Sequence, residues 1–288
     1  MLKSFTYHDV NFRGRIDRVS YITRNGEGQD ARKYANVYLP YGYDGDGTRK
    51  YDILYLMHGG QGNPDSWLDC CSFKNMLDCS FLEKVCQPFI VVFPSYYSSS
   101  SDVAGLSHMD REGKLVREFP TETVKDLIPA VESRIRGWAE TFDEEGLRAS
   151  RAHRAFGGFS MGAVTTWYEF IVNLKVFATF LPLSGDCWAV EHLGGFSKPA
   201  ETADVLARAA EEALRDGCDF RIFVATGSED SACVNLAQQI EEMKRRPVFR
   251  FSEDLNAGNF HYEIAQGAEH TYDNVLDYTY SFLPYLFP

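Results

Sequence analysis

A serine stands where a strand pattern changes into a helix pattern. The stretch GFSMG, residues 158–162, follows the apolar residues 154–156 and precedes a helical pattern. A serine at the tip of such a bend adopts a strained backbone, and neighbouring glycines remove side chains that would collide there. The five-residue pattern also occurs in plain glycine-rich turns, but this strand–turn–helix context predicts that Ser160 is a nucleophile.

A glycine-rich segment could supply backbone donors to the same chemistry. HGGQG, residues 58–62, directly follows the apolar run 51–57. Glycines there can turn an N–H group toward a substrate carbonyl, where negative charge develops during acyl transfer. We expect Gly60, or alternatively Gly59, to be one donor and the N–H of Met161 to be the other. A generic loop after a strand is the other interpretation of this segment.

A general base is expected after residue 160, since such sites run in the order serine, acid, histidine along the chain. Three histidines qualify. His270 lies in a loop between the last strand pattern and the last helix pattern, from which an imidazole can reach over the sheet edge. His261 falls inside an alternating strand, and His192 lies in an irregular stretch. We therefore expect His270 to be the base.

The orienting carboxylate is predicted at the end of another strand. Asp230 comes directly after the apolar run 220–226, where a carboxylate can hold an imidazole in the correct tautomer. His58 precedes the nucleophile, so we expect it to order the glycine loop rather than to act as the base. The rival carboxylates are Glu229, Asp186 and Asp254.

Strand and helix patterns alternate almost from end to end, which predicts crossover units and a mostly parallel sheet. No linker or repeat divides the 288 residues, so we expect one domain, 1–288. The segment 95–119 is long for a loop and is a candidate lid. Strands are expected at 15–24, 33–39, 51–57, 88–93, 153–159, 176–183, 220–226 and 259–265. Helices are expected at 73–86, 121–138 with a kink at Pro129, 161–174, 203–215, 231–245 and 273–285.

The composition and charge of the chain limit which classes of partner it is expected to bind. With 29 basic and 41 acidic residues the net charge is −12, which argues against nucleic acid and anionic membranes. No apolar run suits a membrane span, and the N-terminus lacks a signal-peptide pattern, so we expect a cytoplasmic protein or one whose leader has been removed. The seven cysteines form no CxxC pair, so we expect reduced structural thiols and no metal site.

Four motifs in this order, HGGQGNPDSW, GGFSMG, ATGSED and GAEH, resemble carbohydrate esterase family 1. That family includes feruloyl esterases attached to bacterial xylanases and the broader esterase D-like group. The resemblance runs from about residue 15 to the C-terminus. It implies an α/β-hydrolase fold, with a mostly parallel central sheet flanked by helices on both faces. It also implies a catalytic triad and an oxyanion hole, which correspond to Ser160, Asp230 and His270, and to the N–H groups of Gly60 and Met161.

The resemblance further implies a serine carboxylesterase without a cofactor. Its expected substrates are feruloyl (hydroxycinnamoyl) esters of xylan or xylo-oligosaccharides, cleaved through an acyl-enzyme. Hydrolysis of acetyl-xylan or other small esters and acyl transfer to an alcohol are alternatives, and a catalytically inactive binding module is the non-enzymatic one. The sequence does not predict the oligomeric state. Four aromatic residues near strand ends either grip the ligand or pack: Trp67, Tyr96, Tyr97 and Trp188.

Overall fold

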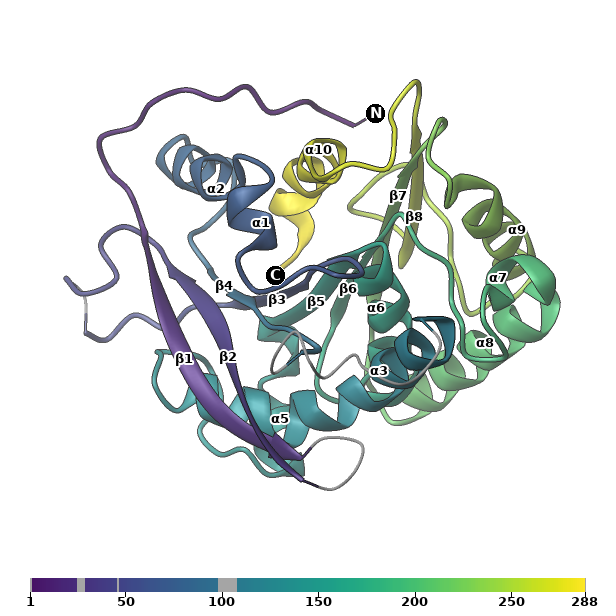
Figure 1. Ribbon diagram of the computed structural model, residues 1–288, viewed down its shortest axis with the longest axis horizontal. Coiled ribbons are helices and arrows are strands. Elements are labelled where there is room, and N and C mark those ends of the chain that lie inside the picture. The colour runs from purple at the N-terminus through teal and green to yellow at the C-terminus, as the bar shows by residue number, and fades with distance from the viewer. Residues whose placement is uncertain (1, 25–28, 46, 98–107, 288) are drawn as a thin grey trace.

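The computed structural model describes residues 2–24, 29–45, 47–97 and 108–287, and its centre is one eight-stranded sheet (Figure 1). The strand order is β1-β2-β4-β3-β5-β6-β7-β8. The first two strands and β4 pair antiparallel, whereas β4, β3 and all strands beyond them pair parallel. The strands are β1 Arg15–Arg24, β2 Asp30–Leu39, β3 Ile53–Met57, β4 Ile90–Phe93, β5 Arg154–Phe159, β6 Thr179–Leu183, β7 Arg221–Gly227 and β8 Phe260–Ala265.

The parallel strands are buried because helices cover both faces of the sheet. Every residue of β3, β4, β5 and β6 is buried, which explains why these strands read as continuous apolar runs instead of alternating ones. On one face α1, α2 and α10 pack over a core that includes Trp67 and Phe73. On the other, α3, α6, α8 and α9 pack over a core that includes Trp167 and Phe180. This arrangement is the expected α/β-hydrolase fold.

The helices lie in the connections between the strands and after the last strand. They are α1 Ser66–Asp69, α2 Phe73–Leu82, α3 His108–Glu122, α4 Ile128–Glu132, α5 Glu144–Ala149, α6 Met161–Val172, α7 Gly194–Ser197, α8 Pro199–Arg215, α9 Cys233–Met243 and α10 Tyr272–Phe282, with a π-helical turn η1 at Thr123–Leu127 and 3-10 turns η2 at Arg151–His153 and η3 at Leu283–Tyr285. None of these helices, within the ranges described, is long and apolar enough to cross a membrane.

The structure differs from the expected elements around residues 95–138. A helix, α3, already begins at His108, inside the segment 95–119 that is predicted to be a loop and a candidate lid, and residues 98–107 lie outside the described residues. In place of the expected single helix 121–138, the end of α3, η1 and α4 follow one another, and the helical part ends at Glu132. The π-helical turn ends just before Pro129, whose nitrogen has no hydrogen to donate, so a change of helical register relieves the conflict at the expected kink.

Candidate active site

The bend between β5 and α6 places Ser160 at a sharp, strained turn. Its backbone has φ 58° and ψ −116°, a combination that side chains rarely adopt. The flanking glycines are needed because there is no room for a Cβ atom on either. A Cβ on Gly158 would lie 2.6 Å from the backbone of Gly162, and one on Gly162 would lie 2.5 Å from the carbonyl oxygen of Met57. The predicted strand–turn–helix context of the serine is confirmed.

The structure brings the three predicted triad residues together although the chain separates them widely. The Ser160 Oγ atom lies 2.9 Å from Nε2 of His270, and Nδ1 of the same imidazole lies 2.8 Å from Oδ1 of Asp230. Asp230 follows β7 and its side chain is fully buried, whereas His270 stands in the loop after β8 and is 31% exposed. A hydroxyl, an imidazole and a carboxylate in this order can generate a nucleophile.

The carboxyl group of Asp230 is held in its charged form. Burial acts to raise its pKa, but hydrogen bonds from His270 and from the Ala232 N–H, 2.7 Å away, outweigh burial and lower the pKa below the usual value. A charged carboxylate accepts the Nδ1 proton of the imidazole. This tautomer leaves Nε2 as the acceptor for the Ser160 hydroxyl, as a general base requires.

The glycine loop after β3 runs beside the serine, since a Cβ on Gly59 would lie 3.5 Å from the Cβ of Ser160. The Gly59 N–H is already used, because it donates to the hydroxyl oxygen of Tyr272 at 3.2 Å. Gly60 lies between the side chain of Glu112 and the start of α6, since a Cβ on it would come 3.1 Å from Oε1 of Glu112 and 3.8 Å from Sδ of Met161. Met161 is the first residue of that helix, so its N–H has no acceptor within the helix and points with the helix dipole. The geometry favours Gly60 over Gly59.

A buried histidine orders this loop. His58 is 1% exposed, with Nδ1 2.7 Å from the Gly59 carbonyl oxygen and Nε2 3.0 Å from Oγ of Ser95. Burial lowers the pKa of His58 to about 4, so the ring is neutral and donates to the carbonyl from Nδ1. A Cβ on Gly62 would lie 2.7 Å from the same ring. His58 orders the loop as expected from its position.

Sequence reasoning missed Tyr272. Besides its bond to Gly59, its ring packs edge-on against Trp67 and Phe159, with centroids 5.2 and 4.9 Å away. The residue opens α10 two positions after His270. No sequence motif marks a tyrosine whose partner lies on a distant loop, so only the folded chain reveals it.

Two of the four aromatic candidates lie in the interior, so for these two the structure favours packing over contact with a substrate. Trp67 is 0% exposed and its indole N–H donates to the carbonyl oxygen of Met57. Tyr96 is 2% exposed, and its hydroxyl lies 3.1 Å from the Met161 carbonyl oxygen and 2.6 Å from Oγ1 of Thr165. The polar atoms of both side chains already have partners inside the protein. These hydrogen bonds link the two residues to Met57 and to α6, so both residues support the segments around the serine.

The other two candidates are half-buried. Tyr97 stacks on the ring of His58 with centroids 5.9 Å apart. Trp188 donates from its indole to Oδ1 of Asp186 at 3.2 Å and packs on His192, with ring centroids 4.2 Å apart. His192 and Asp186, two rival candidates for the triad, are therefore contact partners of Trp188. The remaining rivals also lie elsewhere: buried His261 packs on Phe223, and Glu229 and Asp254 are exposed.

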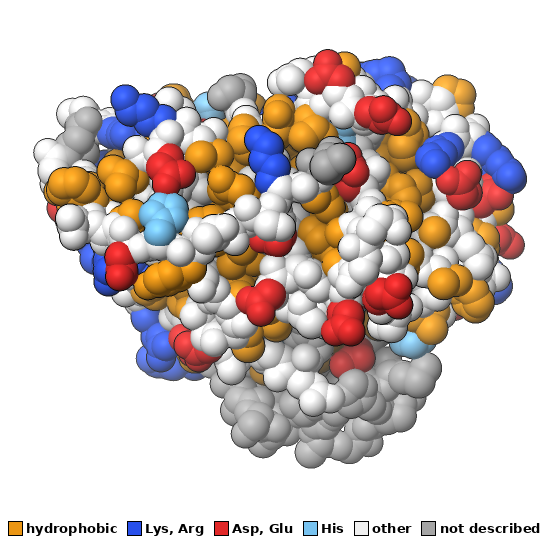
Figure 2. Space-filling view, turned by 90° about the horizontal axis from the view of Figure 1, so that it is seen from above, with side chains coloured by type: hydrophobic (Ala, Val, Ile, Leu, Met, Phe, Trp, Pro, Cys, Tyr) orange, Lys and Arg blue, Asp and Glu red, His pale blue; other side chains and the backbone are white. Residues whose placement is uncertain are grey.

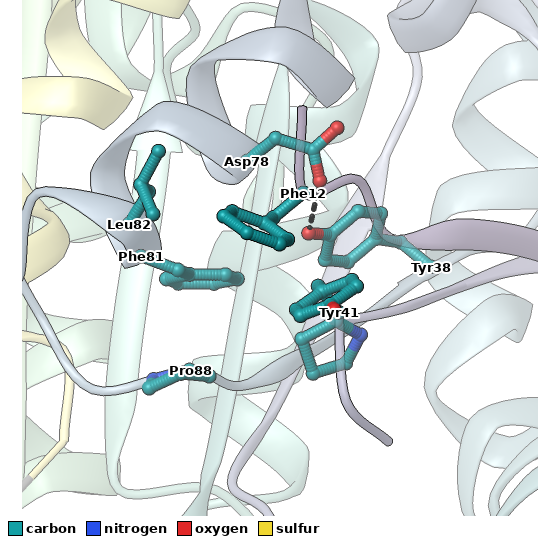
Figure 3. A pocket seen from close by; sticks show the side chains of 8 residues that line it. Phe12, Tyr38, Tyr41, Asp78, Phe81, Leu82 and Pro88 are labelled. Atoms are coloured by element: carbon teal, nitrogen blue, oxygen red, sulfur yellow. Dashed lines mark hydrogen bonds between the residues drawn. The ribbon is translucent and has the colours of Figure 1, made fainter. Parts of the chain in front are cut away.

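A cavity of about 220 Å³ lies away from this site (Figure 3). It opens between the end of β2 and the start of β4, beside α2, whereas the triad follows the carboxyl ends of β5, β7 and β8. The dashed hydrogen bond in the figure joins Tyr38 to Asp78 over 2.8 Å. None of the expected site residues lines it; its walls are Phe12, Tyr38, Pro40, Tyr41, Asp78, Phe81, Leu82 and Pro88.

Comparisons with known proteins agree with the geometry. No protein-family model matches the chain. The chain is 37% identical over 274 residues to endo-1,4-beta-xylanase Y from Acetivibrio thermocellus. That alignment takes in 95% of this chain but only 23% of the xylanase, so the chain spans about a quarter of that relative.

Two solved structures match over nearly the whole length of both chains. One, a protein called FAE, superposes with a TM-score of 0.82 at 35% identity, covering 99% of this chain and 94% of that one. A second is a mutant of the feruloyl esterase module from Clostridium thermocellum complexed with sinapinate. It has a TM-score of 0.79 at 36% identity and covers 99% and 96% of the two chains. A ferulic acid esterase from Anaeromyces mucronatus, 19% identical with a TM-score of 0.69, shares the fold. The chain therefore belongs to carbohydrate esterase family 1, the feruloyl esterase family of serine carboxylic ester hydrolases.

Proposed function

We propose that this protein hydrolyses feruloyl and related hydroxycinnamoyl esters carried by plant cell-wall xylan or xylo-oligosaccharides. The observation that carries the proposal is the hydrogen-bonded series Ser160–His270–Asp230 in a chain of this family. The sinapinate complex of the 36% identical module supports a hydroxycinnamoyl acyl group, and the match to a xylanase supports xylan as its carrier.

In the first half of the reaction His270 Nε2 takes the hydroxyl proton of Ser160 as Oγ attacks the ester carbonyl carbon. Asp230 keeps the imidazole oriented and stabilises its charged form. The tetrahedral intermediate collapses when the sugar oxygen leaves with the proton from His270. The product of this half is a feruloyl ester of Ser160 and a free sugar hydroxyl.

In the second half a water molecule replaces the sugar. His270 takes a proton from the water, whose oxygen attacks the acyl carbon, and then returns the proton to Ser160 as ferulic acid leaves. In both halves the negative charge on the carbonyl oxygen meets the N–H groups of Gly60 and Met161. Each such donor contributes about 3 kcal/mol to transition-state stabilisation.

The substrate class is tested by comparing kcat/KM across a set of esters. Methyl ferulate and feruloylated xylo-oligosaccharides should be hydrolysed with the highest kcat/KM, ahead of p-nitrophenyl acetate, acetylated xylan and S-formylglutathione. A higher kcat/KM on acetylated xylan or on the thioester would contradict the hydroxycinnamoyl assignment. Glycerol should leave the yield of free ferulate unchanged, since an acyltransferase would divert the acyl group to that alcohol.

A further inference from the structure

A second serine lies between the nucleophile and the acid of the triad. Ser184 directly follows β6, the strand between β5 and β7. On one side the Ser160 N–H donates to the carbonyl oxygen of Leu183 at 3.0 Å. On the other side the Ser184 N–H donates to the carbonyl oxygen of Ala225 at 2.9 Å. The end of β6 is therefore tied to the turn that carries Ser160 and to β7, the strand that precedes Asp230.

The backbone of Ser184 is strained. Its φ is 57°, in the left-handed region, and the residue is 1% exposed. Glycine would adopt this conformation without strain, and the chain does place a glycine at the next position, 185. A buried serine at a position that favours glycine indicates a role for its side chain.

Two buried side-chain oxygens at the ends of β6 and β7, Oγ of Ser184 and Oδ2 of Asp230, have no hydrogen-bond partner among the described residues. In Asp230 the Oδ1 atom accepts from His270 and from the Ala232 N–H, whereas the buried Oδ2 atom has no hydrogen-bond partner among the described residues. The buried Oγ of Ser184 also has none among them. The serine side chain is nevertheless close enough to help to lower the pKa of the Asp230 carboxyl. A buried carboxylate oxygen without a donor is costly, and Ser184 offers a buried hydroxyl that has no other partner among the described residues and acts on the same carboxyl.

We propose that Ser184 is a positioning residue of the triad, whose hydroxyl donates a hydrogen bond to Oδ2 of Asp230. This bond holds the carboxylate in the plane in which Oδ1 meets the Nδ1 proton of His270. The strain at Ser184 is then the cost of bringing a donor to a place that the backbone alone does not reach. The inference rests on the proposed function, because the expected effect of Ser184 is on the rate of the reaction that the triad catalyses.

Two substitutions separate the hydroxyl from the strain. Ser184→Ala removes the hydroxyl and keeps the strained backbone with a Cβ atom, whereas Ser184→Gly removes both. Each should lower kcat on methyl ferulate about tenfold, the effect of losing one hydrogen bond to a charged group, with KM changed less than about twofold. Tm should be higher for the glycine variant than for the alanine variant. Equal loss of kcat despite different stability is the expected result.

Lys84→Gly is the matched control. Lys84 is exposed after α2, has φ 59° and lies outside the site, so glycine there relieves the same kind of strain without touching the triad. Its kcat should equal that of the wild type. A second readout is the low-field proton NMR signal of the hydrogen bond between His270 and Asp230, which should shift in both Ser184 variants and stay in place in the control.

A fully active Ser184→Gly enzyme would overturn the proposal, and so would a kcat that follows Tm from one variant to the other. An unchanged NMR signal in both variants would overturn it as well. The wild-type rate on methyl ferulate tests the proposed function separately. If another ester proves to be the substrate, the same variants are compared on that ester, so the two proposals can fail independently.

Discussion

Tyr272 binds the glycine loop through Gly59, a residue 213 positions earlier in the chain. Its hydroxyl oxygen accepts the Gly59 N–H, and its own position is set two residues after His270 at the start of α10. The tyrosine therefore fixes the position of the glycine loop relative to the start of α10. By occupying the Gly59 N–H, it also leaves the Gly60 N–H as the oxyanion donor that we propose for this loop.

Tyr272→Phe should lower kcat on methyl ferulate about tenfold with little change in KM. The phenylalanine keeps the ring contacts with Trp67 and Phe159 but leaves the Gly59 N–H without its acceptor, so the loop loosens where the oxyanion forms. Steady-state kinetics measure the effect. Tyr280→Phe, on the same helix and packed on Phe5, is the control and should keep the wild-type kcat. Equal kcat in both variants would rule out this role for Tyr272.

The sequence predicts the three triad residues because each stands just after a strand, next to glycines or in a polar loop. Tyr272 and Ser184 carry no such marker. Their roles depend on partners elsewhere in the chain, Gly59 for Tyr272 and Asp230 for Ser184. The left-handed backbone at residue 184 is likewise not predicted by any local sequence pattern. Burial likewise separates the four aromatic candidates: Trp67 and Tyr96 turn inward, which their positions near strand ends do not reveal.

At the scale of elements, a buried carboxyl group, that of Glu169 on α6, contacts the π-helical turn η1. Glu169 is 0% exposed, with Oε1 2.6 Å from Oγ1 of Thr123 and Oε2 2.6 Å from Nδ2 of Asn173. Burial raises its pKa to about 7, from an ordinary value of 4.5, against the opposing effect of these two bonds. A neutral carboxyl donates its proton to Thr123, whose own hydroxyl donates to the carbonyl oxygen of Phe119.

Glu169 should make the folded state less stable as the pH rises. Below about pH 4.5 the group is neutral both folded and unfolded; between pH 4.5 and 7 only the unfolded chain ionises, so the free energy of unfolding falls by up to about 3 kcal/mol. Glu169→Gln keeps the same donors and acceptors without a charge. Urea titrations from about pH 4.5 to 7.5 should show the variant gaining this amount over the wild type.

The control for this titration is Glu118→Gln, an exposed carboxylate on α3 that pairs loosely with Lys114. It should leave the pH dependence of the wild type unchanged. If Glu169→Gln and the wild type differ by the same free energy at every pH, then Glu169 does not titrate in this window.

The alternation of strands and helices was sufficient to predict the sheet, because parallel strands covered on both faces need continuous apolar runs. The short helices α1, α5 and α7 escape such reasoning, since four to six residues show no helical period. The start of α3 at His108 also escapes it, because that helix is polar over its first turns and the sequence around it resembles a loop.

At the scale of the whole molecule, the core is large enough to hold the fold without cross-links. All seven cysteines are free thiols, and burial raises the pKa of Cys187 to about 12, which keeps it protonated. The net charge of −12 does not repel an uncharged sugar ester but does repel the carboxylate that hydrolysis releases. On the face in Figure 2, acidic side chains are interspersed with hydrophobic and basic ones.

Thermal unfolding should therefore be insensitive to reductant. Tm with and without dithiothreitol should agree within about 1 °C, because no disulfide constrains the unfolded chain. Differential scanning fluorimetry of fresh protein measures this directly. A Tm that drops on reduction would mean that two of these thiols pair in solution.

The central claim is that the hydroxyl of Ser160 attacks the ester carbonyl, and Ser160→Ala tests it most directly. The measurement is the rate of methyl ferulate hydrolysis at enzyme concentrations high enough to detect a residual kcat, with Tm recorded to show that the variant is folded. The account predicts a loss of at least about 10⁴-fold in kcat and a Tm within a few degrees of the wild type. A folded variant that still releases ferulate at a rate near that of the wild type would contradict it.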